Sequence, residues 1–230
     1  MPRVSELLVV AAPSCCGKTR FLNRVFDGRH DELLALMGFS DSIQSFMPVL
    51  ARELPKYRGA RIPRMILHFA LPVVPLVDGR PERSSNEPVF EFVRTCDNVT
   101  AITLLASGDV LRSRLRSRYR WAHKLLFKSV SRYLSVRRRL RKSIRNYEDP
   151  NLAVAYEAWF RYIESLPNVA NHWLVTAQGE YELRAPADWC EIRNSYFGHL
   201  PEPTLPNAAP AAANESSPRI IEKVFADGTQ

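Results

Sequence analysis

The chain has 230 residues, of which 46% are hydrophobic, and a formal net charge of +8 at pH 7. This length suffices for one domain with a buried core, with room for a lid and a tail. The longest apolar run is far short of the ~20 residues of a membrane span, and no secretory signal pattern follows the first residues, so we expect neither a membrane nor a secreted protein. The four cysteines include no C-x-x-C pair, and two of them, Cys15 and Cys16, are adjacent. Because adjacent cysteines rarely form a disulfide with each other, a reducing, cytoplasmic setting is favoured.

Residues 7–12 (LLVVAA) are a short, wholly apolar run that predicts a buried strand of a parallel sheet. From Gly17 onward the apolar positions follow helical spacing. The corner between strand and helix has the sequence Ala12, Pro13, Ser14, Cys15, Cys16, Gly17, Lys18, Thr19. It matches the spacing G/A-x-x-x-x-G-K-S/T in the strand–loop–helix context that a phosphate-binding loop requires.

The residue types in this corner suit a phosphate chain. A small residue at position 12 and Gly17 let backbone N–H groups approach phosphate oxygens. The N-terminus of the following helix adds free N–H groups and the positive end of its dipole. Lys18 supplies a positive charge for the outer phosphates, and the Thr19 hydroxyl is suited to ligate Mg²⁺. The alternative is an ordinary strand–loop–helix corner without a ligand.

On these residues the chain resembles the P-loop nucleoside triphosphate-binding proteins, and in size and layout their small-molecule and nucleotide kinase branch. The resemblance implies an α/β fold: a three-layer sandwich with a mostly parallel sheet, helices on both faces and a basic helical lid. It implies ATP (or GTP) and Mg²⁺ as cofactors, held by residues 12–19 with Thr19 as the metal ligand. Ala12 replaces the first glycine of the family pattern, a departure that the pattern tolerates.

The next elements are predicted from periodicity and from breakers such as Pro55 and Gly59. We expect helical pieces within residues 29–60, including 42–55, then a basic segment at 56–64. Residues 71–88 are rich in proline and polar residues and predict a loop. Further strands are expected at 65–69, 99–105 and 173–176, and a short helix at 87–95. Strands separated by helical stretches predict a parallel, helix-covered sheet.

A long basic segment lies between the third and fourth predicted strands. Apolar residues at helical spacing from Leu111 to Tyr147 predict one amphipathic helix, or two broken near residues 129–131. Asp149 and Pro150 then predict the N-cap and first turn of another helix, whose aromatic residues are expected to pack in the core. Residues 200–230 lack periodicity and predict a disordered tail, which leaves one domain at 1–199 with a lid-like region at about 108–150.

The resemblance assigns catalysis to positive side chains. In kinases of this branch, a helix with repeated arginines follows the third strand and closes over the phosphates. This implies catalytic roles for Lys18 and for three arginines at i, i+4 and i+8 on one helix face: Arg112, Arg116 and Arg120. Arg114 and Arg118 lie on another face. A solvated surface helix is the alternative for each arginine.

A carboxylate expected from the resemblance is missing. The kinases have an Asp or Glu at the end of a core strand, whereas the second predicted strand ends at His68, Phe69 and Ala70. Asp78 is the nearest substitute, and His68 is a candidate base or a packing residue.

Two functions therefore stay open. The first is an ATP-dependent kinase that transfers the γ-phosphate to a small anionic metabolite or nucleotide, with residues 56–64 contacting this acceptor. The second is a nucleotide-binding module without phosphotransfer, which docks nucleic acid or an anionic membrane surface through its basic helix. A sulfotransferase-like protein is a third possibility, although Gly-Lys-Thr suits a triphosphate with Mg²⁺ better.

Overall fold

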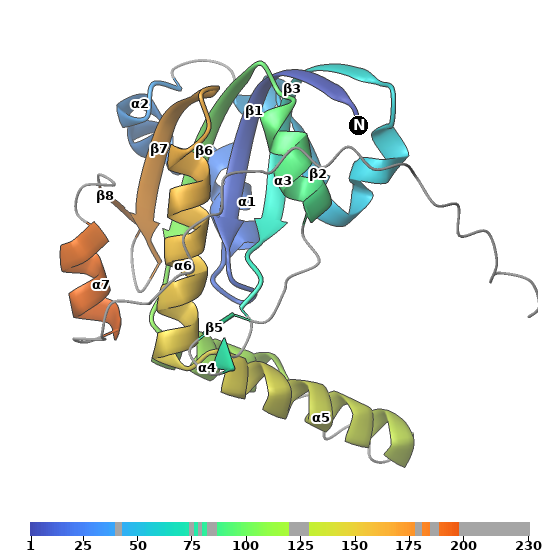
Figure 1. Cartoon of the computed structure of the whole chain (residues 1–230), viewed down its shortest axis with the longest axis vertical. Helices are drawn as coiled ribbons and strands as arrows, with labels where there is room; N and C mark the ends of the chain where they lie inside the picture. Colours follow the sequence, from blue (N-terminus) through green and yellow to red (C-terminus); the bar gives the residue numbers. More distant parts are fainter. Residues whose placement is uncertain are drawn as a thin grey trace, which may run out of the picture.

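The structure is a computed structural model of the whole chain (Figure 1). It describes residues 1–39, 43–73, 76–77, 80–81, 87–119, 129–177, 181–184 and 189–197. Three features predicted from the sequence lie outside these ranges: Arg120, Asp78 and the tail at 200–230.

Six strands form one sheet in the order β2-β3-β1-β6-β7-β8 (Figure 1). Their bounds are β1 (Arg3–Ala12), β2 (Met47–Leu50), β3 (Arg61–Ala70), β6 (Asn98–Leu105), β7 (Val169–Thr176) and β8 (Glu182–Arg184). Neighbouring strands pair in parallel except β7 and β8, which are antiparallel. The four predicted strands and the mostly parallel α/β sheet are confirmed.

The helical prediction for residues 42–55 was wrong at Met47–Leu50, which form strand β2. A 3₁₀ turn, η1 (Ile43–Ser45), precedes the strand, and a 3₁₀ helix, η2 (Ala51–Tyr57), follows it. Val49 is buried, and it pairs with Leu67 of β3. Pro48 is tolerated because β2 is an edge strand. A two-residue antiparallel pair, β4 (Leu76–Val77) and β5 (Arg80–Pro81), also interrupts the stretch predicted as a loop.

Helices cover both faces of the sheet. Helices α3 (Glu87–Arg94) and α6 (Asp149–Glu164) lie on one face, and α1 (Lys18–Phe26) lies on the other (Figure 1). The chain also forms α2 (Asp31–Leu36) and α7 (Trp189–Phe197), and α7 packs against α6. This arrangement is compatible with a three-layer sandwich. Within the described ranges, each helix is too short or too polar to cross a membrane.

Helix α6 attaches to the sheet through its aromatic residues, as predicted. Trp159 and Tyr156 are buried. The Trp159 indole donates to Thr103 Oγ1 at 2.9 Å, and the Tyr156 hydroxyl donates to the Leu104 carbonyl at 3.1 Å. Thr103 also contacts His172 Nε2 at 3.0 Å. The helix begins one residue before the prediction, because Glu148 rather than Asp149 is its N-cap.

The basic segment forms two helices, α4 (Gly108–Arg118) and α5 (Val130–Asn146). Ser129 caps α5 through its hydroxyl, which accepts from the Arg132 N–H at 3.4 Å, so a helix boundary lies where the sequence predicts a break. Helix α4 follows β6 directly. Helix α5 extends away from the sheet and the other helices (Figure 1).

The carboxyl ends of the parallel strands meet at one edge of the sheet. From β1 the chain builds β2 and β3 on one side of this central strand, and then β6 and β7 on the other. In open α/β sheets, ligands bind at the carboxyl edge where the strand order reverses in this way. The loop at residues 12–19 leaves β1 at this edge.

Candidate functional site

The 12–19 loop turns through two residues in the left-handed region. Cys15 has φ +69°, the one positive φ of a non-glycine residue in the described part of the chain, and Gly17 has φ +107°. Gly17 is the N-cap of α1. A Cβ at this position would lie 3.4 Å from the Tyr181 hydroxyl and would strain the backbone. The loop therefore requires glycine immediately before Lys18.

Lys18 folds back onto its own loop. Its Nζ donates to the carbonyl oxygens of Ala12 at 2.6 Å and Pro13 at 2.9 Å, and the side chain is 5% exposed. Burial lowers the pKa of Lys18 to about 8. The ammonium group is thus held by neutral acceptors, and an anion beside it would favour its charged form.

Side chains from distant elements bind three more of the loop carbonyls. The bonds run from Tyr147 Oη to Ser14 O (2.9 Å), from Arg114 Nη1 to Cys16 O (2.7 Å) and from Tyr181 Oη to Gly17 O (3.5 Å). The Cys16 thiol is buried and donates to the Leu104 carbonyl at 3.4 Å. These bonds hold the loop in place beside the first N–H groups of α1, which have no acceptor within the helix and can bind a ligand.

A cavity of about 770 Å³ opens beside the loop. Besides the loop, it is lined by Leu50 to Arg52 after β2, by His68 and Ala70 of β3, and by α4. The charged side chains along the described lining are all cationic: Lys18, Arg20, Arg52, Arg114 and Arg118. This composition suits a ligand with several negative charges.

The arginines of α4 that reach the loop are Arg114 and Arg118. Arg114 bridges the loop to the end of β7 by donating to Cys16 O and, through Nη2, to Ala177 O at 2.6 Å. Arg118 Nη1 lies 3.8 Å from Cys15 Sγ. Their positions follow from the burial of Leu111 and Leu115, which fixes the rotation of α4 about its axis.

Two of the three arginines that the resemblance selects, Arg112 and Arg116, do not line this cavity. Arg112 donates to the Tyr147 carbonyl and pairs with Asp109 at 2.8 Å, so it joins α4 to the end of α5. Arg116 is exposed, and Arg120 lies outside the described residues. The basic segment at 56–64 is also distant, because it leads into the start of β3 whereas the loop lies at the end of that strand.

His68 is the titratable group at the end of β3. Burial, together with the positive charge of Lys18, lowers its pKa to about 4. The imidazole is therefore neutral at pH 7 and able to accept a hydrogen bond, but it is a weaker base than an ordinary histidine. It lines the same cavity as Lys18 and Thr19.

A metal ion would depend on few protein ligands here. The described lining of the cavity contains Thr19 but no carboxylate, and the described residues form no group of three His, Cys, Asp or Glu suited to a metal. Asp149 is engaged by the Gly108 N–H at 3.2 Å and lines a different cavity with Arg112. Thr19 with nucleotide phosphate oxygens and water fits Mg²⁺, which commonly keeps several waters.

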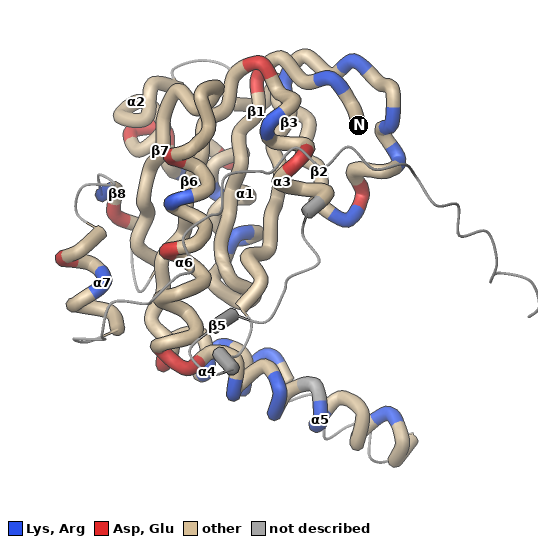
Figure 2. Tube along the Cα trace, in the orientation of Figure 1, with Lys and Arg blue, Asp and Glu red and all other residues tan. Residues whose placement is uncertain are grey.

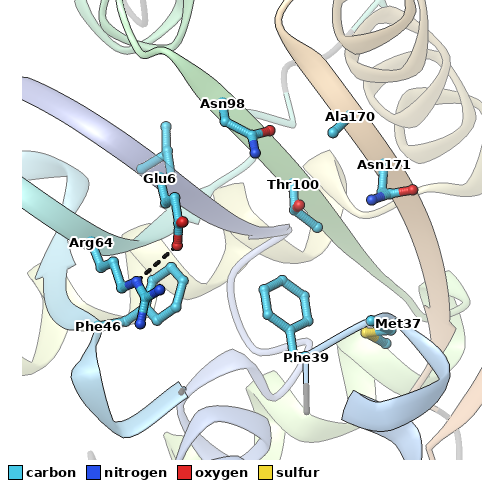
Figure 3. A pocket seen from close by; sticks show the side chains of 11 residues that line it. Glu6, Met37, Phe39, Phe46, Arg64, Asn98, Thr100, Ala170 and Asn171 are labelled. Carbon is cyan, nitrogen blue, oxygen red and sulfur yellow. Dashed lines mark ion pairs between the residues drawn. The ribbon is translucent and has the colours of Figure 1, made fainter. Parts of the chain in front are cut away.

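A second cavity of about 490 Å³ lies toward the opposite edge of the sheet (Figure 3). Its charged lining residues, Glu6 and Arg64, pair with each other at 2.9 Å, and Phe39 and Phe46 close one side. Among the described residues that line it, no charge is left without a partner. It therefore lacks the strong cationic character of the cavity beside the loop.

Neither the known protein families nor the curated proteins contain a match to this chain.

Proposed function

We propose that the chain is a P-loop nucleoside triphosphate-binding protein that transfers the γ-phosphate of ATP to a small anionic acceptor. The proposal rests on one observation: the Gly-Lys-Thr loop, at the carboxyl ends of the parallel strands, opens into a cavity whose charged side chains are all cationic along the described lining. Side chains bound to the carbonyls of the loop hold it in place.

In this proposal, different residues of the site bind different parts of the nucleotide. The N–H groups at the start of α1 and the Lys18 ammonium hold the phosphates, and Thr19 holds Mg²⁺, which neutralises charge on the phosphate oxygens. Arg114 and Arg118, already beside the loop, supply positive charge to the transferred group. Catalytic roles for Arg112, Arg116 and Arg120 stay predictions from the resemblance.

The acceptor occupies the part of the cavity lined by Arg52 and His68. Arg52 attracts an anionic group, while neutral His68 accepts a hydrogen bond from the acceptor hydroxyl and orients it. This assignment fits the cavity of about 770 Å³, which lies within the ordinary size range of small-molecule sites.

The test is ADP release from Mg·ATP in the presence of pools of phosphorylated and carboxylated metabolites. We expect one acceptor class to stimulate release in the wild type, and Lys18→Met to abolish it. Arg52→Gln is expected to raise the acceptor KM by roughly ten-fold or more while the KM for ATP changes little, because Arg52 contacts the acceptor alone. A proportional change in both KM values would contradict the acceptor assignment.

A second candidate is a nucleotide-binding module without phosphotransfer. The observation in its favour is the lack of a carboxylate along the described lining of the cavity. Tight Mg·ATP binding without stimulation by any acceptor would support it against the kinase.

A further inference from the structure

Helix α5 is a cationic arm on the surface of the molecule. Its 17 residues contain no Asp or Glu, and its basic positions are Arg132, Arg137, Arg138, Arg139, Arg141, Lys142 and Arg145. Figure 2 shows Lys and Arg positions along this helix, which projects beyond the rest of the described chain. Within the described residues, no ion pair joins an α5 side chain to a carboxylate. The positive charge of the arm is therefore left for a partner.

The apolar side of α5 is already occupied. Leu140 and Ile144 pack against the core, and Tyr133 is 7% exposed. The side that faces solvent carries the basic residues. At 3.6 residues per turn, the positions of Arg137 and Arg132 mark the limits of a basic arc of roughly 220° around the helix axis.

A helix with basic residues around so much of its circumference fits a groove of a nucleic acid better than a flat membrane surface. A membrane surface contacts a helix along one stripe and requires an apolar face to insert. In α5, the exposed large apolar side chains among the described residues are only Val130 and Leu134. The two walls of a groove, in contrast, present phosphates to both sides of a helix at once.

The width of an α-helix, compared with the widths of nucleic-acid grooves, favours duplex DNA as the partner. An α-helix with its side chains is about 10–12 Å across, and the major groove of B-DNA is about 12 Å wide. The major groove of duplex RNA is too narrow and deep for side chains to enter. We infer that α5 docks in the major groove of duplex DNA, with its arginines on the phosphates of both walls. This inference does not depend on the proposed phosphotransfer.

The experiment measures binding of the full chain to a short fluorescent duplex DNA by anisotropy over a series of salt concentrations. The test variant is Arg138→Gln/Arg141→Gln/Lys142→Gln, whose three positions are exposed on the basic arc. We expect the slope of log affinity against log salt to fall in magnitude by about three, and the affinity at low salt to fall roughly ten-fold or more. Glutamine preserves helix propensity, so circular dichroism is expected to stay unchanged.

The matched control is Arg3→Gln/Arg58→Gln/Arg61→Gln, which removes the same charge from exposed positions at the opposite edge of the sheet. A small change in the control with a large loss in the test variant would support the inference. Equal losses in the two variants would overturn it, because they would indicate attraction by net charge alone. Equal binding of duplex RNA or single strands, or binding of phosphatidylserine vesicles without binding of duplex DNA, would also overturn it.

Discussion

Lys18 is a buried lysine with neutral acceptors, and this makes nucleotide binding depend on pH. The folded protein without ligand holds the pKa of Lys18 at about 8, because burial disfavours the charged form. Bound phosphate favours the ammonium form and raises this pKa again. Binding above pH 8 must therefore take up a proton.

We predict that the affinity for Mg·ATP is constant near pH 7 and falls above pH 8, by up to about ten-fold per pH unit. The nucleotide phosphates are fully ionised in this range, so the change in affinity reflects the titration of the protein. Isothermal titration calorimetry in buffers of different ionisation enthalpy measures both the affinity and the proton uptake. A constant affinity up to pH 9.5 would contradict the assigned contact between Lys18 and phosphate.

Arg114 and Arg116 offer a matched pair on one helix. Arg114 holds two carbonyl oxygens, one of them in the loop, whereas Arg116 is exposed. Because hydrogen bonds from charged groups contribute about 1.5–3 kcal/mol, Arg114→Gln should weaken Mg·ATP binding by roughly ten- to hundred-fold. Arg116→Gln removes the same charge and should change the affinity less than about three-fold. Equal effects of the two changes would show that Arg114 has no particular role at the loop.

The sequence could identify the loop but not the arginines that reach it. The spacing from Ala12 to Thr19 specifies its own local structure, because glycine and the helix start are local features. The choice between Arg112 and Arg114 depends instead on the rotation of α4, which Leu111 and Leu115 fix by burial. These two leucines were the signal available in the sequence, since they show which side of α4 faces the core.

At the scale of elements, Thr103 joins β6 to both α6 and β7. It is fully buried, accepts from Trp159 Nε1 at 2.9 Å and contacts His172 Nε2 at 3.0 Å. Thr103→Val keeps the shape of the side chain but leaves the buried Trp159 N–H and the half-buried His172 Nε2 without this partner. We expect a loss of about 2–4 kcal/mol in the free energy of unfolding, measured by urea denaturation.

The control for this change is Thr100→Val on the same strand, which is half-buried beside the second cavity. It should change the free energy of unfolding by less than about 1 kcal/mol. If Thr103→Val were as stable as the wild type, the contacts between β6 and α6 would not be an important source of stability.

Element prediction succeeded where periodicity and burial agree. The strand at 7–12 is apolar throughout, the strand at 99–105 is apolar except for two threonines, and both lie in the middle of the sheet, so their local pattern and their environment match. Strand β2 was missed because it is a four-residue edge strand containing Pro48, and its pairing with β3 is a tertiary contact. Helix α7 was missed because its stability depends on packing against α6.

At the scale of the whole molecule, a half-buried histidine makes folding sensitive to acid. Burial lowers the pKa of His172 to about 4, whereas an unfolded histidine titrates near its ordinary value of 6.5. As the pH falls through 6.5, the unfolded chain binds a proton that the folded chain does not. The free energy of unfolding therefore falls between pH 6.5 and pH 4 and is insensitive to His172 outside this window.

We predict that acidification from pH 6.5 to pH 5 costs up to about 2 kcal/mol through His172. His172→Gln should lose this part of the pH dependence, although its stability at pH 7 is lower because the contact with Thr103 changes. Urea denaturation of both proteins at the two pH values measures the difference. An identical pH dependence in the variant would contradict the assigned burial of His172.

The central claim is that a nucleoside triphosphate binds at the 12–19 loop. The most direct measurement compares the Tm of the wild type and of Lys18→Met with and without Mg·ATP. Ligand at about 100 times its Kd stabilises the folded state by about 2.7 kcal/mol, which raises the Tm of a domain of this size by roughly 5–10 °C. We predict this rise in the wild type and none in Lys18→Met. The same rise in both proteins, or none in the wild type, would contradict nucleotide binding at this loop.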